Sequence, residues 1–366
     1  MTLSTYSFAL PTRIVFGQGV ISTVGEEAKA LDAKKVLIVA DKGVINAGLI
    51  KPVEESLKQV NISYKIFDKI VPNPRDTDCH VGYELAKQEK VDALIAVGGG
   101  SSMDTAKAIG TLLTHGGKIQ DWCGFQLLKR EITPLIAIPT TAGTGSEVTP
   151  FAVITDTEQH TKLNVFDPKA AARVALVDPT VLLNLPSHIM ASTGIDAMTH
   201  AVEAYTCKLA NPHTDACALY AIELIQNNLR KAVSNPDLES CTGMMLGSNI
   251  AGIAFTPHGI ANAVLLPTVT EFNIPSDLDK HVNVAKALGV QVQGMDKEEA
   301  AMEGVKALQQ LCDDVGIPKI KDIKGINPDD FEALAIASEK NVSTPSNPRE
   351  VTANDYLELF RKAYES

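Results

Sequence analysis

Two side chains four residues apart could bind a metal ion. Asp196 and His200 fall in a stretch with helical periodicity, and residues at i and i+4 of a helix project from the same face. A carboxylate and an imidazole arranged in this way can hold a divalent cation. The same spacing also fits a surface ion pair or a histidine that serves packing alone. His258, between Pro257 and Gly259, is the candidate third ligand.

A run of three glycines could bind a phosphate group. Gly98, Gly99 and Gly100 follow an apolar run of strand length and precede an expected helix at 101–113. Glycines let the backbone approach a ligand closely, and the start of a helix offers free N–H groups to an anion. The run matches neither general glycine motif for nucleotides, so a tight turn without a ligand is the alternative.

An acidic residue ends the first apolar run. Asp41 follows residues 36–40, and a carboxylate there can accept both ribose hydroxyls of an adenosine. It would repel a 2′-phosphate, which favours NAD over NADP. Asp41 could instead only cap the following helix. A polar loop at 139–147 suits the pyrophosphate and nicotinamide half of a dinucleotide, although a flexible loop has the same composition.

The elements that carry these residues alternate in the first half of the chain. Continuous apolar runs that alternate with helical segments are typical of a parallel sheet covered on both faces. The apolar runs are 36–40, 64–67, 93–97 and 135–139, and the helical segments are 44–59, 78–90 and 101–113. Ligands of such sheets bind at the carboxyl ends of the strands.

The second half of the chain has only helical periodicity. The expected helices are 187–207, 214–233, 239–255, 260–272, 278–288, 297–315, 329–339 and 354–365. We therefore expect an α/β domain at 1–185 and an all-helical domain at 186–366. A helical domain packed at the strand ends would form a cleft of the kind that binds small molecules.

The composition excludes several classes of function. The 366 residues carry a net charge of −11, which argues against binding to nucleic acid or to an anionic membrane. No apolar run approaches the ~18 residues that span a bilayer, and the first twenty residues lack the pattern of a signal peptide. The six cysteines form no C-x-x-C pair, as expected for reduced thiols in a soluble cytoplasmic protein.

Six motifs occur in one order along the chain. They occupy residues 16–19, 71–74, 98–107, 139–147, 194–200 and 257–263. In this combination the chain resembles the iron-containing (group III) alcohol dehydrogenases, which include lactaldehyde/1,2-propanediol and 1,3-propanediol dehydrogenases. The likeness extends from about Phe8 to beyond Glu350. It implies a nucleotide-binding α/β domain followed by a helical metal-binding domain, the architecture of dehydroquinate synthase-like proteins.

The resemblance assigns roles residue by residue. It implies that Asp41 holds the adenosine ribose and that Asp196, His200 and His258 are metal ligands at the catalytic centre. The other implied cofactor contacts are Asn73, Gly98, Gly99, Gly100, Ser101, Asp104, Thr140, Thr141, Thr144, Ser146 and Lys162. Phe255 matches an aromatic wall near the substrate. Phe151 and Leu266 are further candidates for an apolar lining, although all three could be core residues.

The chain departs from the family at one point. Family members carry a glycine-rich helical stretch with a further histidine ligand and a nearby histidine before the Pro-His-Gly motif, whereas here Phe255 precedes Thr256 directly. About twenty residues are missing, which as a helix would span about 30 Å. Either the printed sequence omits a stretch, or the chain has a true deletion, or the site is rebuilt with fewer ligands. We favour the first, because loss of an interior helix should cost several kcal/mol.

The expected reaction is hydride transfer between NAD and a small primary alcohol or diol. A divalent cation beside the oxygen would stabilise the alkoxide, and Fe(II) suits two histidines and a carboxylate, with Zn(II) possible. If the missing segment is truly absent, low or lost activity is expected. The alternatives are a non-catalytic nucleotide-binding protein and a lyase of the dehydroquinate synthase type. The lyase is disfavoured, because such sites need several Lys and Arg residues to hold a polyanionic substrate and few basic residues lie near the metal motifs. The resemblance also implies a homodimer or higher oligomer, because the family commonly forms dimers, sometimes through its N-terminal strand, here about residues 6–16.

Overall fold

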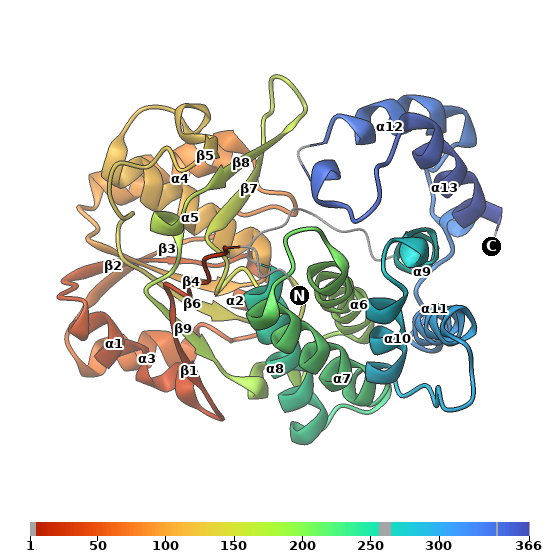
Figure 1. Ribbon diagram of the computed structural model, residues 1–366. Coiled ribbons are helices and arrows are strands. Elements are labelled where there is room, and N and C mark those ends of the chain that lie inside the picture. The colour runs from red at the N-terminus through yellow and green to blue at the C-terminus, as the bar shows by residue number, and fades with distance from the viewer. Residues whose placement is uncertain (1–4, 256–264, 342, 366) are drawn as a thin grey trace. The chain divides into compact units, whose positions relative to one another are not determined.

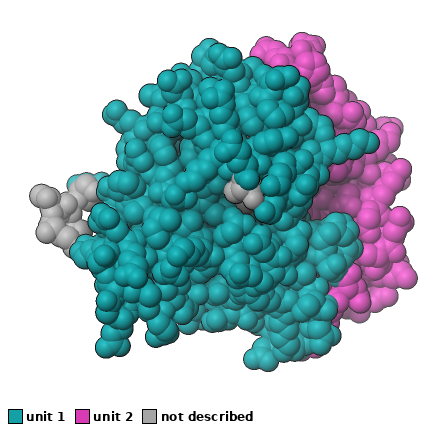
Figure 2. Space-filling view, turned by 90° about the vertical axis from the view of Figure 1, so that its right-hand side faces the viewer, with its two compact units in different colours: residues 1–6, 185–366 teal, residues 7–184 magenta. Residues whose placement is uncertain are grey.

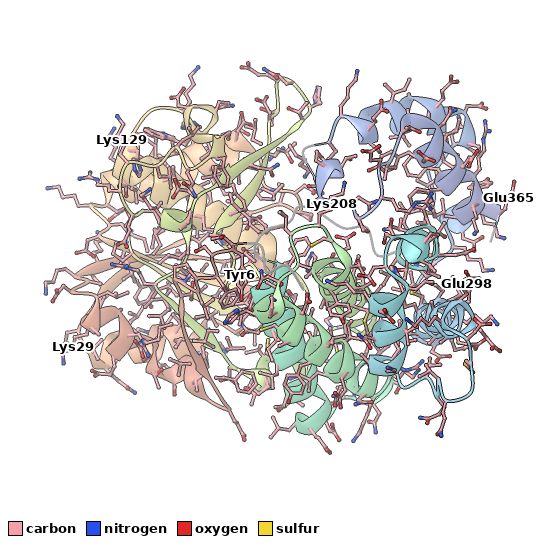
Figure 3. All side chains as sticks on the ribbon, viewed as in Figure 1. Tyr6, Lys29, Lys129, Lys208, Glu298 and Glu365 are labelled. Carbon is pink, nitrogen blue, oxygen red and sulfur yellow. The ribbon has the colours of Figure 1, made fainter. Side chains whose placement is uncertain are left out.

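The computed structural model describes residues 5–255, 265–341 and 343–365, which form two compact units (Figure 1). The sheet unit comprises Ser7–Asn184 (Figure 2). The helical unit comprises Leu185–Ser366 together with the first six residues. Charged side chains such as Lys29, Lys129 and Glu298 are exposed to solvent (Figure 3). None of the helices in the described ranges is long and apolar enough to cross a membrane.

A parallel six-stranded sheet forms the centre of the sheet unit. Its strand order is β1-β9-β6-β4-β2-β3. The strands are β1 (Arg13–Phe16), β2 (Lys35–Val39), β3 (Ser63–Phe67), β4 (Ala93–Gly98), β6 (Leu135–Pro139) and β9 (Val174–Val177). Every residue of β4 and β6 is buried, because helices cover both faces of a parallel sheet. The predicted α/β fold with a parallel sheet is therefore confirmed.

Alternate side chains of the strands pack into two separate hydrophobic cores, one on each face of the sheet. Leu37, Leu94 and Leu135 pack on one face with residues of α4 (Asp76–Gln88) and α5 (Gly100–His115). Ile38 and Ile95 pack on the other face with α1 (Val24–Ala30) and α3 (Lys51–Gln59). Successive strand residues point to opposite faces, so each continuous apolar run fills both cores.

Two expectations for the sheet unit are incomplete or wrong. The expected helix at 44–59 is two helices, α2 (Lys42–Asn46) and α3, because the chain turns at Gly48 with φ +76°. The sequence patterns do not predict β9 or a second sheet of order β5-β8-β7, whereas β1 lies within the N-terminal strand expected at residues 6–16. The strands of that sheet are β5 (Gly124–Phe125), β7 (Phe151–Thr155) and β8 (Lys162–Phe166). They are short or half exposed, so they lack the continuous apolar runs of the main sheet.

The described part of the helical unit contains helices and no strand. The helices are α6 (Ser187–Thr206), α7 (Pro212–Ser234), α8 (Leu238–Phe255), α9 (Leu266–Asn273), α10 (Leu278–Ala287), α11 (Lys297–Asp314), α12 (Phe331–Glu339) and α13 (Ala353–Glu365). α6, α7 and α8 pack against one another. The helix expected at 260–272 is described only from residue 265 onward, where α9 begins at Leu266.

Candidate cofactor and metal sites

The turn between β4 and α5 has the form of an anion cradle. Gly98 has φ +154°, and a Cβ on it would lie 2.3 Å from Ser102 Oγ. The N-cap residue of α5 is Gly99, which has no side chain to bond the free N–H groups of the first turn. Ser102 Oγ is buried and has no hydrogen-bond partner among the described residues. Free N–H groups and an unpaired hydroxyl at a helix start fit a phosphate group.

Asp41 lies beside this turn at the end of β2. Its Oδ1 accepts a hydrogen bond of 3.1 Å from the N–H of Val44, so it does cap α2. Its Oδ2 would lie 3.5 Å from a Cβ built on Gly98. The capping role therefore uses one carboxylate oxygen and leaves the other beside the glycine turn.

The polar loop after β6 packs against the same turn. The N–H of Thr140 donates to the carbonyl of Gly98 over 3.0 Å. A Cβ on Gly99 would lie 3.2 Å from Thr141 Oγ1. Likewise, a Cβ on Gly100 would lie 2.9 Å from Thr144 Cγ2, so any larger residue in the turn would push the loop away. Ser101 occupies the first turn of α5 beside these residues.

Asp104 connects α5 to the far end of the loop. Its Oδ1 accepts from Ser146 Oγ at 2.7 Å, and its Oδ2 accepts from the N–H of Val153 at 3.1 Å. Burial raises the pKa of Asp104, and the charge of Lys107 opposes this rise. Sequence reasoning gave Lys107 no role. The signal for it is a lysine within an otherwise apolar helical stretch, which predicts a buried ammonium group.

Lys162 and Asn73 meet although they are far apart in the sequence. Lys162 Nζ donates to Asn73 Oδ1 at 2.7 Å and to Thr155 Oγ1 at 3.1 Å. Asn73 has φ +56°, a conformation that asparagine tolerates. Partial burial lowers the pKa of Lys162, and the charge of Asp104 opposes this effect. Within the sheet unit, the structure thus groups Asp41 with the glycine turn and the loop, and pairs Asn73 with Lys162.

The pair proposed as metal ligands is on one face of α6. His200 Nε2 lies 3.8 Å from Asp196 Oδ1. Two donor atoms at this separation can reach one ion, because metal bonds to nitrogen and oxygen are about 2.1 Å long. Burial raises the pKa of Asp196, and His200 opposes the rise. His200 Nδ1 is buried without a hydrogen-bond partner among the described residues. A histidine that served packing alone would have this nitrogen hydrogen-bonded, so the geometry favours a ligand role for His200.

The third candidate ligand, His258, lies outside the described residues, as does Thr256, whose distance from Phe255 would reveal a break in the chain. Within the described ranges, no group of three or more His, Cys, Asp and Glu side chains could hold a metal ion. The residues that the structure describes therefore provide two ligands, and they fit a divalent cation that needs further donors.

The candidate substrate residues are placed in both units. Phe255 ends α8 and is 2% exposed, and its ring centroid lies 4.2 Å from that of His200. Leu266 is buried in α9. Phe151 begins β7 and stacks on Phe166 with ring centroids 5.9 Å apart. Phe255 thus packs directly on a candidate metal ligand, as an aromatic wall of that site would.

Comparisons with known proteins cover almost the whole chain. The family model described as "Iron-containing alcohol dehydrogenase" matches residues 11–179. The model "Fe-containing alcohol dehydrogenase family, C-terminal" matches 190–256 and 256–364. The chain is 38% identical to an NAD-dependent methanol dehydrogenase of Bacillus methanolicus over 98% of this chain and 99% of that protein. It is 36% identical to a 1,3-propanediol dehydrogenase of Citrobacter freundii over the full length of both.

Solved structures agree with these sequence relatives. An alcohol dehydrogenase from Oenococcus oeni superimposes with a TM-score of 0.95 at 38% identity, covering 98% of this chain and 100% of that chain. A 1,3-propanediol oxidoreductase superimposes with a TM-score of 0.94 at 35% identity, with coverage of 98% and 100%.

The comparisons also bear on the segment before the Pro-His-Gly motif. The alignment with the Citrobacter freundii protein has 388 positions and includes all 366 residues of this chain, so 22 positions have no counterpart here. The C-terminal family model matches in two segments that meet at residue 256. The alignment length agrees with a missing stretch of about twenty residues, and the split match agrees with its place before the Pro-His-Gly motif.

The names of these relatives are those of dehydrogenases, and a lactaldehyde reductase of Escherichia coli K12 is 37% identical over 95% of this chain and 97% of its own length. The alternative of a non-catalytic nucleotide-binding protein therefore gains no support. The resemblance seen in the sequence is confirmed: the chain belongs to the iron-containing alcohol dehydrogenase family and is an NAD-dependent oxidoreductase of that type.

Proposed function

We propose that this chain interconverts a small primary alcohol or diol and its aldehyde, with NAD as the hydride carrier. The observation that carries the proposal is the grouping of Asp41, the glycine turn and the polar loop at the carboxyl ends of the neighbouring strands β2, β4 and β6. The relatives named above act on methanol, propanediol and lactaldehyde, which favours a substrate of one to three carbon atoms.

Within this proposal the expected α/β domain at residues 1–185 binds the cofactor through the sheet unit, Ser7–Asn184. Asp41 Oδ2 would accept from the adenosine ribose, and its negative charge would exclude a 2′-phosphate. The N–H groups at the start of α5 and the hydroxyl of Ser102 would bind the pyrophosphate. Lys162, held by Asn73, would lie on the nicotinamide side with Asp104, Thr140 and Ser146.

The expected helical domain at residues 186–366 would bind the metal ion through Asp196, His200 and His258. When bound, NAD accepts the hydride and the metal ion acts as a Lewis acid toward the substrate oxygen. Asp196 must be ionised to be a ligand, although burial favours its protonated form. Phe255 packs on His200 and would restrict the ring's rotation and exclude water from it. The oxygen and nitrogen donors suit Fe(II), and Zn(II) could replace it.

Further parts of the proposal concern the cell and the assembly. The six free cysteines favour a cytoplasmic protein, because thiols stay reduced in the cytosol. We propose that it acts as a homodimer or a higher oligomer of this chain, in which residues 6–16 contribute to the interface.

The test is NAD reduction followed at 340 nm with the purified, metal-loaded protein. Ethanol, 1,2-propanediol and 1,3-propanediol are supplied in turn, with Fe(II) or Zn(II), and NADP replaces NAD in a parallel series. We expect NADH formation that depends on the metal and is lost in His200→Ala. Equal rates in the wild type and in His200→Ala would contradict the proposal.

A further inference from the structure

Lys107 is a charged side chain with no part in the function proposed above, yet it is fully buried. It lies two turns into α5 with an exposed fraction of 0%. A buried ammonium group costs several kcal/mol unless its N–H groups are paired. The contacts of its Nζ atom therefore indicate why the lysine is there.

Among the described residues, the hydrogen bonds of the Lys107 ammonium group all go to one segment of chain. Nζ donates to the carbonyl oxygens of Ser146 at 2.7 Å, Thr149 at 3.0 Å and Phe151 at 2.8 Å. It also donates to Ser146 Oγ at 2.9 Å. The three N–H groups of the ammonium thus bond four oxygen atoms in the segment that runs from the polar loop into β7. This one side chain therefore holds the backbone of residues 146–151 in place.

Asp104 acts on the same segment from one turn earlier in α5. It accepts from Ser146 Oγ and from the N–H of Val153, so the Ser146 hydroxyl joins the carboxylate to the ammonium group. Burial lowers the pKa of Lys107 to about 8, and the charges of Asp104 and Glu147 oppose the fall. Asp104 and Lys107 thus hold residues 146–153 by hydrogen bonds from two successive turns of α5, and we call this pair the clamp.

The clamp joins two segments that must keep a fixed spacing. The first turn of α5 is the glycine turn, and the clamped segment continues from the loop that carries Thr141 and Thr144. A Cβ built on Gly99 would lie 3.2 Å from Thr141 Oγ1, and one built on Gly100 would lie 2.9 Å from Thr144 Cγ2, so the turn leaves no room for a side chain beside those threonines. If the polar loop moved away from α5, the space between the loop and the glycine turn, where the phosphate is expected, would become wider.

We propose that Lys107 is a positioning residue for the cofactor, which holds the polar loop at a fixed distance from the glycine turn through its bonds to 146–151. This role rests on the proposed function, because it assumes that NAD binds between these two segments. A lysine that served only core stability would affect folding but not the spacing of the cradle.

The first experiment needs no cofactor. Lys107→Met keeps most of the side-chain volume and removes the donors, whereas Thr111→Val alters a fully buried residue one turn later that bonds only the carbonyl of Lys107. Amide hydrogen exchange of the cofactor-free proteins is compared over 140–153. We expect exchange about tenfold faster or more in Lys107→Met and little change in Thr111→Val. Equal exchange in the two variants would overturn the proposal.

The second experiment measures NADH binding by fluorescence and the steady-state constants. Lys107→Met should raise the NADH dissociation constant and the KM for NAD about tenfold or more, with kcat at saturating NAD changed much less. An unchanged dissociation constant would overturn the positioning role. If the wild type binds no NADH, the proposed function fails, while the exchange comparison still decides whether Lys107 fixes the loop.

A milder variant covers the case in which Lys107→Met does not fold. Ser146→Ala removes the hydroxyl shared by Asp104 and Lys107 but leaves the carbonyl contacts in place. We expect exchange in 140–153 to rise about threefold, with folding intact. Exchange equal to that of the wild type would then contradict the proposal.

Discussion

The two oxygens of the Asp41 carboxylate have separate tasks. Oδ1 caps α2, and Oδ2 lies beside the glycine turn, so the two interpretations that the sequence left open are compatible in the geometry. A substitution can therefore separate them, because serine also caps helices but carries no negative charge.

We predict that Asp41→Ser weakens NAD binding without unfolding the protein. Loss of a charged acceptor for the ribose hydroxyls should raise the KM for NAD about tenfold or more. The preference for NAD over NADP should fall at the same time, because the repulsion of a 2′-phosphate is gone. Steady-state kinetics with both cofactors measure this, and an unchanged cofactor preference would refute the role given to Asp41.

His200 is predicted to be needed for metal binding. His200→Ala removes one of the two described ligands, so the purified protein should hold much less than one equivalent of iron after loading and dialysis. His188→Ala is the matched control, since His188 is an exposed histidine on the same helix. Metal analysis of the three proteins is the measurement, and equal iron contents would exclude His200 as a ligand.

We predict that Glu203 makes the free energy of unfolding of the metal-free protein depend on pH. Burial, with the nearby charge of Asp196, raises the pKa of this residue from its ordinary 4.5 to about 8. Between these values the unfolded chain releases the proton and the folded chain keeps it. The free energy of unfolding should therefore fall as the pH rises from about 4.5 to about 8, by up to about 1.4 kcal/mol per pH unit.

The measurement is urea unfolding at pH 5, 6.5 and 8 in the presence of a chelator. Glu203→Gln should lose this part of the slope, whereas Glu223→Gln, at an exposed position of α7, should keep it. If Glu203→Gln followed the wild type at all three pH values, the buried carboxyl would not be the cause.

At the scale of elements, the turn from β4 to α5 is the part most sensitive to change. Gly98→Ala would place a Cβ 2.3 Å from Ser102 Oγ at a backbone φ of +154°, which side chains rarely adopt. We expect a loss of about 1–3 kcal/mol in the free energy of unfolding and weaker NADH binding. The double variant Gly98→Ala, Ser102→Ala should recover only the steric part, and full stability of the single variant would contradict this account of the turn.

The elements differ in how far the sequence predicts them. β2, β3, β4 and β6 are predictable because each is an apolar run between turn residues. β1 and β9 have only four residues, and β7 alternates between buried and half-buried positions, so their patterns are weak. The split between α2 and α3 depends on the φ of one glycine, which periodicity does not reveal.

The candidate site follows the same rule. The residues of the glycine turn and of α6 are predictable because they are close together in the sequence. The contact of Lys162 with Asn73 joins residues 89 positions apart, and the bonds of Lys107 to Ser146 join residues 39 apart. The spacing of residues along the chain does not reveal such contacts, because they form only when the fold brings distant segments together.

At the scale of the whole molecule, the missing segment bears on the rate rather than on the family. The 22 unmatched positions lie in an alignment that otherwise spans both chains from end to end, so the family assignment does not depend on them. If the segment is truly absent from the protein, the site has fewer metal donors, and we expect turnover below that of relatives that contain the segment. The reaction type should be the same.

The central claim is that this chain transfers a hydride from an alcohol to NAD. The most direct measurement supplies 1,3-propanediol deuterated at its carbinol carbons and weighs the reduced cofactor by mass spectrometry. Hydride transfer from the carbinol carbon should give reduced cofactor one mass unit heavier than NADH with the iron-loaded wild type, and none with His200→Ala. Reduced cofactor without the label, or no reduced cofactor at all from the wild type, would contradict it.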